Sequence, residues 1–122
     1  MTKLTRHELE VMDLFWDHGT ATIREILDLI PAKRRPAYTT VQTVVNRLEA
    51  KGALLRTGKV GNAHTFEPVI TRPRTYRRII SDVVKVVGSA QQLVSHLVES
   101  GELSLEDLRA LEEELSDREA GS

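Results

Sequence analysis

The residues best suited to chemistry gather in one short segment, where small hydroxyl and amide side chains alternate with valines. Its polar members are Tyr38, Thr39, Thr40, Gln42, Thr43, Asn46 and Arg47. Glutamine and asparagine can each form two hydrogen bonds with adenine, and a threonine methyl group can contact the thymine methyl group. Hydroxyl groups also bind phosphates. The segment therefore carries side chains of the types that are suited to reading double-stranded DNA.

Three members of this segment have competing explanations. Thr39 stands near the expected start of a helix, so we expect it to help cap that helix. Thr43 lies further inside, where threonine is a poor helix former without a capping role, and this favours a contact with DNA. Arg47 fits a phosphate contact and an ion pair with a neighbouring acid equally well, and both alternatives stay open.

Basic side chains flank the segment and would supply the electrostatic part of DNA binding. Lys33, Arg34 and Arg35 precede it, and Lys59 follows in a loop that contains glycine. Four arginines crowd the start of a later helix: Arg72, Arg74, Arg77 and Arg78. For a single one of these residues a solvated surface charge is the commoner explanation. As a set around one helix they favour phosphate binding, whose affinity falls steeply with salt.

The formal charge of -1 hides an asymmetry between the two parts of the chain. Residues 1–78 hold 14 Lys and Arg against 8 acids, a net charge of +6, whereas residues 79–122 hold 3 against 10, a net charge of −7. Such asymmetry indicates one part that faces nucleic acid and one that stays away from phosphates. Chance segregation on two solvated surfaces gives the same values, so charge alone does not decide.

Hydrophobic spacing and capping signals place the DNA-reading segment on the third of three helices. The first two helices begin with the capping boxes Thr5…Glu8 and Thr22…Glu25. The residues expected to end the three helices are Gly19, Pro31 and Gly52. The third helix runs from about residue 38 to residue 51, with valines and a leucine on its apolar face.

Two strands and three more helices follow. Residues 53–56 and 63–68 predict strands joined by a hairpin loop of residues 57–62, longer than two residues. The later helices are expected in residues 71–87, around 93–98, and from Ser104 onward. The final residues, 117–122, are expected to form a frayed polar tail.

Three helices followed by a two-stranded hairpin have the layout of a winged helix-turn-helix, whose third helix enters the major groove. The predicted fold is mostly α (α+β): a winged helix-turn-helix with a two-stranded wing in residues 1–70, then a three-helix dimerisation domain in residues 71–122. Three short amphipathic helices cannot close a core alone, so we expect a two-fold homodimer; folding back as a monomer is the alternative. The apolar residues expected at the dimer interface are Ile79, Ile80, Val83, Val84, Val87, Leu93, Leu97, Leu105, Leu108 and Leu111.

Nothing in the sequence has the pattern of an enzyme site. The four histidines are scattered over four predicted elements, and the chain has no cysteine for a disulfide or a thiolate metal site. It also has no glycine-rich phosphate loop and no nucleophile elbow. No segment approaches the ~18 apolar residues of a membrane span, and no signal peptide begins the chain. We expect a cytoplasmic protein without enzymatic activity, metal or other cofactor, and without membrane insertion.

The chain contains two longer motifs, Leu4-Thr5-x-x-Glu8-x-x-Val11-Met12-x-x-x-Trp16 and the more specific Ala37-Tyr38-Thr39-Thr40-Val41-x-Thr43-Val44-x-x-Arg47-Leu48-x-x-Lys51-Gly52. Both motifs resemble the penicillinase-repressor (BlaI/MecI) family. The wing, Gly61-x-Ala63-His64-x-Phe66-x-Pro68, extends the match. The resemblance implies a homodimeric transcriptional repressor that occupies an inverted-repeat operator. It also places Thr39, Thr40 and Thr43 in the DNA-reading helix, with Arg47 toward its far end.

The resemblance implies a further partner, because some relatives are induced when a membrane-bound zinc metalloprotease sensor leads to cutting of the dimerisation domain. The sequence departs from the family at three points. Asn62 stands where the wing often carries a basic residue, and His96-Leu97 replaces the asparagine–phenylalanine cleavage site of the beta-lactam repressors. The C-terminal cysteines of the copper-responsive branch are missing. Induction by proteolysis and induction by loss of the dimer both stay open.

Two other functions stay as alternatives. A winged-helix protein-interaction module would present an exposed apolar face on its third helix, whereas this helix is rich in hydroxyl groups. A regulator that senses a small ligand would need polar residues in the apolar stripes of its dimer domain, and these stripes have few. The sequence therefore favours the repressor.

Overall fold

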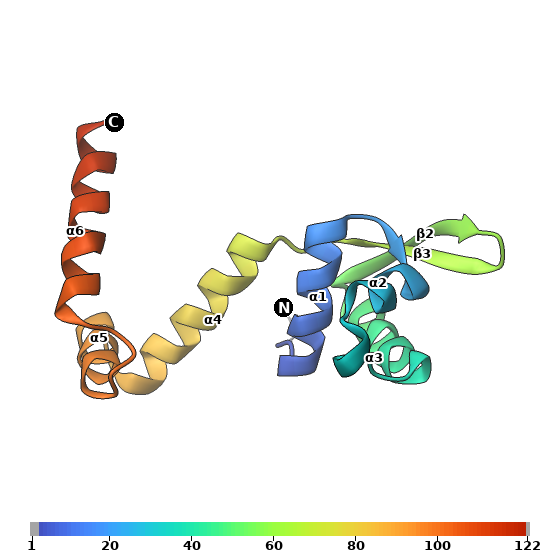
Figure 1. Cartoon of the computed structure of the whole chain (residues 1–122), viewed down its shortest axis with the longest axis horizontal. Helices are drawn as coiled ribbons and strands as arrows, with labels where there is room; N and C mark the ends of the chain where they lie inside the picture. The colour runs from blue at the N-terminus through green and yellow to red at the C-terminus, as the bar shows by residue number, and fades with distance from the viewer. Residues whose placement is uncertain (1–2, 122) are drawn as a thin grey trace. The chain divides into compact units, whose positions relative to one another are not determined.

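The computed structural model describes residues 3–121, which divide into two compact units within Met1–Tyr76 and Arg77–Ser122. The first unit contains α1 (Arg6–His18), β1 (Ala21–Thr22), α2 (Ile23–Leu29), the short helix η1 (Ala32–Arg34), α3 (Tyr38–Ala50), β2 (Leu54–Val60) and β3 (Ala63–Pro68) (Figure 1). Helix α4 (Arg72–Val87) begins in the first unit and continues into the second, which also contains α5 (Ala90–Glu99) and α6 (Leu105–Ala120). The predicted order of three helices, a hairpin and three helices is confirmed.

Reciprocal side-chain caps begin several of these helices. Thr5 and Glu8 each accept a hydrogen bond from the other's backbone N–H group, and Thr22 and Glu25 do the same at α2. Each pair satisfies two N–H groups that the start of a helix leaves without a partner. Ser104 caps α6 in the same way. The predicted capping boxes are confirmed.

Helix α3 starts at Tyr38 as predicted, but its cap differs from the prediction. Its cap residue is Ala37, whose carbonyl oxygen accepts hydrogen bonds from the N–H groups of Thr40 and Val41 at 3.0 and 3.3 Å. The expectation that Thr39 helps to cap this helix is therefore wrong. Thr39 lies in the first turn with its side chain exposed.

The core of the first unit fixes the orientation of α3. Helices α1, α2 and α3, the sheet and the residue before β2 supply the buried side chains Val11, Met12, Phe15, Ala21, Ile23, Ile26, Leu27, Val41, Val44, Val45, Leu48, Ala53, Leu54 and Phe66. Burying a valine or leucine side chain fully contributes about 1.5–3 kcal/mol. The four apolar residues of α3 in this core therefore hold one face of the helix inward and leave the opposite face in solvent.

The sheet has three antiparallel strands in the order β1-β3-β2, one more than predicted. β1 is only two residues long, and Ala21 and Thr22 pair with Phe66 and Thr65 of β3. The strand closes the sheet against the helices, because Ala21 and Phe66 are both buried in the core.

The hairpin is longer and its loop is shorter than predicted. β2 and β3 stay paired as far as Val60 and Ala63, so only Gly61 and Asn62 form the loop. The predicted loop of residues 57–62 is therefore wrong. Gly61 has a φ of +60°, which a glycine at the first position of a two-residue hairpin loop adopts without strain.

The second unit has no interior of its own. None of the described residues 77–121 is buried. Its large exposed apolar side chains are Ile79, Ile80, Val83, Val86, Val94, Val98, Leu105, Leu111 and Leu115. Among the helices described, none combines the length and apolar character needed to cross a membrane.

Helix α6 extends beyond its predicted end. It continues to Ala120, so the frayed tail expected from Asp117 is wrong as far as that residue, and Ser122 lies outside the described residues. An ion pair joins Arg118, in the last turn of the helix, to Glu114, one turn earlier. Pairs at this i,i+4 spacing stabilise helices by about 0.2–0.5 kcal/mol.

Candidate nucleic-acid interface

The polar residues of α3 form one continuous exposed face, opposite the valines and the leucine that the core holds. All seven side chains singled out from the sequence are exposed: Tyr38, Thr39, Thr40, Gln42, Thr43, Asn46 and Arg47. We call this set the α3 face. Within the described residues Arg47 forms no ion pair, so the alternative of an ion pair with a neighbouring acid is not realised.

Thr43 has a restricted hydrogen-bonding role on this face. Its hydroxyl donates to the carbonyl oxygen of Thr39, one turn earlier, at 2.9 Å. The hydroxyl proton is therefore engaged within the helix, while the oxygen lone pairs and the methyl group still point outward. In this arrangement Thr43 can accept a hydrogen bond from a base and can contact a methyl group.

The structure adds a cation to the α3 face that sequence reasoning missed. The guanidinium of Arg24, in the first turn of α2, lies 5.2 Å from the centroid of the Tyr38 ring. Both side chains are exposed. The stacking holds a positive charge beside the start of α3, and only the fold brings these two residues together, because they are 14 positions apart in the sequence.

The basic segment before α3, which includes η1, contains side chains in two environments. Arg35 donates hydrogen bonds to the carbonyl oxygens of Ile30 and Asp28, so it braces the end of α2. Lys33 and Arg34 are exposed and, among the residues that the structure describes, pair with no carboxylate. Their charges are therefore available to an external anion.

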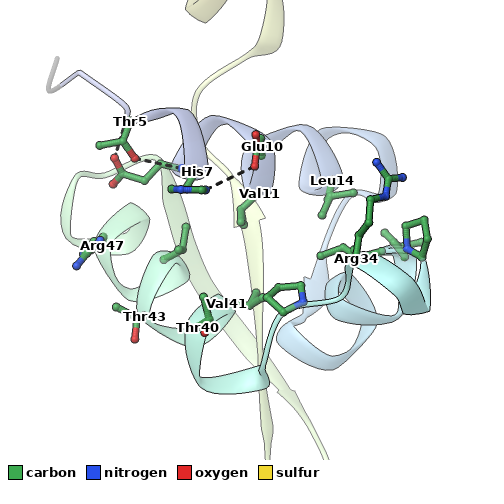
Figure 2. Close-up of a pocket in the computed structure, with 16 residues that line it drawn as sticks. Thr5, His7, Glu10, Val11, Leu14, Arg34, Thr40, Val41, Thr43 and Arg47 are labelled. Carbon is green, nitrogen blue, oxygen red and sulfur yellow. Dashed lines mark hydrogen bonds and ion pairs between the residues drawn. The ribbon is translucent and has the colours of Figure 1, made fainter.

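A groove of about 960 Å³ runs between α1 and α3 (Figure 2). The apolar residues Val11 and Val41 line it, Arg34 and Arg47 lie toward its two ends, and Thr43 lies on its α3 side. The groove therefore continues the α3 face sideways, with a guanidinium toward each end.

The wing carries a further exposed cation, Lys59. Lys59 pairs with His64 across the hairpin, close to the loop of Gly61 and Asn62. The wing is attached to α3 through Arg56, whose guanidinium forms two hydrogen bonds with the Glu49 carboxylate at 3.0 and 3.1 Å. Lys59 is thereby held on the same unit as the α3 face.

Arg72 occupies a different environment from the other predicted DNA contacts. Its guanidinium donates to Asp17 Oδ1 at 2.8 Å and to Asp13 Oδ1 at 3.2 Å. The hydrogen bond to Asp17 is the main reason that the pKa of Arg72 is raised. The structure thus groups Arg72 with the carboxylates of α1, and its predicted contact with a phosphate stays a prediction.

A buried ion pair connects α1 to the end of α3. Glu8 is 1% exposed, and its Oε1 atom accepts a hydrogen bond from Lys51 Nζ at 2.6 Å. Burial raises the pKa of Glu8, but the hydrogen bonds from Lys51 and Thr5 outweigh burial and leave the pKa below its ordinary value. The same carboxylate therefore caps α1 and is bonded to Lys51, the residue that ends α3.

The structure offers no grouping that points to metal chemistry. Over residues 3–121, no three histidine, aspartate or glutamate side chains come together as metal ligands.

A three-helix core with a wing, and a third helix whose outward face carries hydrogen-bonding groups framed by cations, define a winged helix-turn-helix protein. The family model of the penicillinase repressor matches residues 4–117, and the chain belongs to this family. The transcriptional regulator BlaI of Mycobacterium tuberculosis is 34% identical over 128 residues, which cover 99% of this chain and 91% of that protein. The family resemblance seen in the sequence motifs is confirmed.

A solved structure and a second relative agree with this assignment. The solution structure of the DNA-binding domain of the repressor BlaI is 31% identical in sequence, with a TM-score of 0.50, and covers 59% of this chain and 90% of that domain. An uncharacterised 16.5 kDa protein of Latilactobacillus sakei is 30% identical over 95 residues, which are 78% of this chain and 58% of that protein. The winged-helix fold class is confirmed.

Proposed function

We propose that this chain represses transcription by occupying an inverted-repeat operator as a homodimer, with α3 of each protomer in the major groove. One observation carries the proposal: seven hydrogen-bonding side chains are exposed on one face of α3 while the opposite face is fixed in the core. These exposed polar side chains do not take part in the hydrophobic core. Their hydrogen-bond donors and acceptors match those of base edges. Family membership supports the same function.

The basic residues would supply the phosphate contacts. Lys33, Arg34, Arg47 and Lys59 are exposed around the α3 face, and Arg24 joins them through its stacking on Tyr38. Each neutralised phosphate releases counterions, so the logarithm of the binding constant falls linearly with the logarithm of the salt concentration. Arg35 and Arg72, whose guanidinium groups have partners within the protein, are the weakest members of the predicted set.

Thr43 would favour an A·T base pair. Its oxygen can only accept a hydrogen bond, because its proton is donated to Thr39. In the major groove, adenine N6 is a donor and thymine carries a methyl group. An acceptor and a methyl group on one side chain match both partners of that pair.

The second unit would form the dimer interface. Its described residues have no buried core, and it leaves long apolar side chains in water at a cost of about 25 cal/mol per Å². A second copy is the occupant that we propose, because an isologous pair presents two α3 faces to a repeat of matching symmetry. The proposed interface consists of Ile79, Ile80, Val83, Val84, Val87, Leu93, Leu97, Leu105, Leu108 and Leu111.

Induction would act by separating the two protomers. His96 and Leu97 lie inside α5, where a protease reaches the backbone only after local unfolding. Loss of the dimer, with or without a cut, is therefore the step that we propose for release from DNA. A membrane metalloprotease sensor is a candidate partner, and incubating the chain with membranes that contain such a sensor tests whether α5 is cut.

A gel-shift titration with the DNA upstream of the protein's own gene tests the proposed function. We expect retardation at low salt and steep loss of binding as salt rises. Thr43→Ala should weaken specific binding by about 1–3 kcal/mol. Ser116→Ala, which removes an exposed hydroxyl from α6, is the matched control and should bind like the wild type. A folded protein that retards no upstream DNA at low salt would refute the proposal.

A further inference from the structure

The junction between the winged domain and α4 is held by more contacts than a connecting segment needs. Trp16 of α1 donates a hydrogen bond from its indole nitrogen to the carbonyl oxygen of Ile70, just before α4, at 2.9 Å. The side chains that tie the second half of α1 to the first turn of α4 are Asp13, Trp16, Asp17, Arg72 and Tyr76. We call this set the α1–α4 latch.

Arg72 is the centre of the latch. Its Nη2 atom donates to Asp17 Oδ1 at 2.8 Å and to the carbonyl oxygen of Asp13 at 3.0 Å, and its Nε atom donates to Asp13 Oδ1 at 3.2 Å. The guanidinium also lies 5.4 Å from the centroid of the Trp16 ring. Since a planar guanidinium presents its donors in a fixed fork, this set of partners fixes the orientation of the side chain.

Tyr76 adds a second point of attachment one turn later. Its hydroxyl donates to Asp13 Oδ1, and its ring meets the Trp16 ring edge to face at a centroid distance of 5.9 Å. Residues 72 and 76 share one face of α4, and residues 13, 16 and 17 share one face of α1. Two attachments on one helical face fix both the rotation and the direction of the first turn of α4.

The latch matters because of where the two units divide. The division falls between Tyr76 and Arg77, inside α4, and the helix continues without interruption to Val87. After Pro73 no glycine or proline occurs before Gly88. Sharp kinks need such residues, a bulge or an inserted side chain, and residues 74–87 contain no glycine or proline for one.

We propose that the α1–α4 latch is a positioning device that determines which spacing between operator half-sites the protein accepts. The proposal rests on the proposed function, because spacing matters only to a dimer on an inverted repeat. With the latch closed, a winged domain has one direction relative to the start of α4. With the latch open, the carboxylates of α1 no longer fix that direction.

Local stability alone explains the latch less well. The side chains of Arg72, Asp13 and Asp17 are 35%, 38% and 66% exposed. Ion pairs at this exposure contribute little to folding stability, because water screens them and ordering them costs side-chain entropy. The three contacts to one guanidinium restrict the direction of the first turn of α4 through their geometry. They do this without a large contribution to the free energy of folding.

Binding to a series of inverted repeats tests the proposal. The spacer between the half-sites is lengthened one base pair at a time up to about five, roughly half a helical turn. Wild-type affinity should fall by about a hundredfold at the half turn, because simultaneous engagement of both half-sites is lost. In the Asp13→Asn/Asp17→Asn double variant the fall should shrink to about tenfold or less, with weaker binding at the best spacing.

Two further variants complete the spacing experiment. Glu10→Gln removes a carboxylate from an exposed position of the same helix and should keep the wild-type spacing profile. Tyr76→Phe keeps every charge and both rings, and should flatten the profile in part. Comparing ratios between spacings cancels the gain in non-specific affinity that comes from removing negative charge.

Each outcome decides one proposal. A wild-type protein that binds no inverted repeat contradicts the proposed function itself. A wild-type profile without spacing preference, or a double variant with an unchanged profile, overturns the latch as a positioning device and leaves the proposed function intact. If the double variant loses single half-site binding and thermal stability together, the latch is only part of the winged-domain fold, and the proposal is overturned.

Discussion

Glu8 shows how one residue serves the stability of the fold and the position of α3. Its carboxylate accepts hydrogen bonds from the Thr5 backbone and from Lys51 Nζ, while its Oε2 atom has no partner among the described residues. A buried charge with an unpaired oxygen is stabilised only as long as its cation stays in place. The charge of Glu8 therefore links the start of α1 to the end of α3.

Glu8→Gln should lower the free energy of unfolding by about 1–3 kcal/mol near neutral pH, since Lys51 loses its charged partner. The pKa of Glu8 is lower in the folded state than in the unfolded state. The contribution of its charge to the free energy of unfolding is therefore complete above about pH 5, and it is lost as the pH falls through the pKa of the folded state. Urea unfolding of both proteins at several pH values measures this. The control Glu10→Gln should change stability by less than about 0.5 kcal/mol. An equal difference between wild type and Glu8→Gln at pH 3 and pH 7 would contradict the assignment.

At the scale of single residues, sequence patterns identified the exposed face but not every contact on it. The periodic valines of α3 determined which side chains point outward, and all seven predicted residues do so. The intrahelical hydrogen bond of Thr43 and the stacking of Arg24 on Tyr38 depend on side-chain conformation and on the fold. Neither leaves a periodic signal in the sequence.

At the scale of elements, helices with caps and the strand β3 were predictable, whereas β1 and the outer part of β2 were not. The capping boxes at Thr5 and Thr22 place helix starts through local chemistry, which a sequence contains in full. β1 has only two residues, which pair through backbone atoms with a strand more than 40 positions away. The outer half of the wing is exposed on both faces, so hydrophobic alternation could not show that β2 continues to Val60.

The wing offers the clearest prediction at this scale. Lys59→Ala should weaken binding to all DNA sequences to a similar degree and reduce the salt slope by about one. A change of this kind identifies a phosphate contact, because phosphates carry no sequence information. Gel shifts at several salt concentrations, with specific and scrambled duplexes, measure both quantities.

Lys85→Ala removes an exposed lysine of α4 from the second unit and is the matched control. Its salt slope should equal that of the wild type. If Lys59→Ala also keeps the wild-type slope, the wing does not contact the phosphates, and binding depends on the α3 face and its loop.

At the scale of the whole molecule, the two units differ in charge and in the burial of their apolar side chains. The cations gather in the first unit, and the second unit carries most of the acids together with the unburied apolar stripes. The sequence predicted this division but not its structural boundary region, where Arg72 and Tyr76 belong to the first unit through contacts with residues 55 to 63 positions away. Contacts at such separation are a property of the fold alone.

Ile80→Lys should shift the protein toward a monomer, because it places a charge on the proposed dimer surface while the chain alone leaves this residue 55% exposed. The thermal stability of the winged domain should stay unchanged. Sedimentation velocity measures the oligomeric state. Lys85→Ala is again the control, and a Ile80→Lys protein that remains dimeric would remove this residue from the interface.

The stoichiometry of the complex with operator DNA tests the central claim most directly. Sedimentation of the 13.7 kDa chain with a duplex carrying the upstream inverted repeat should show two protomers on each duplex. The complex should dissociate as salt rises and should be weaker by about a thousandfold or more on a scrambled duplex. A single protomer on the full repeat, or equal affinity for the scrambled duplex, would contradict a dimeric repressor that reads its operator through α3.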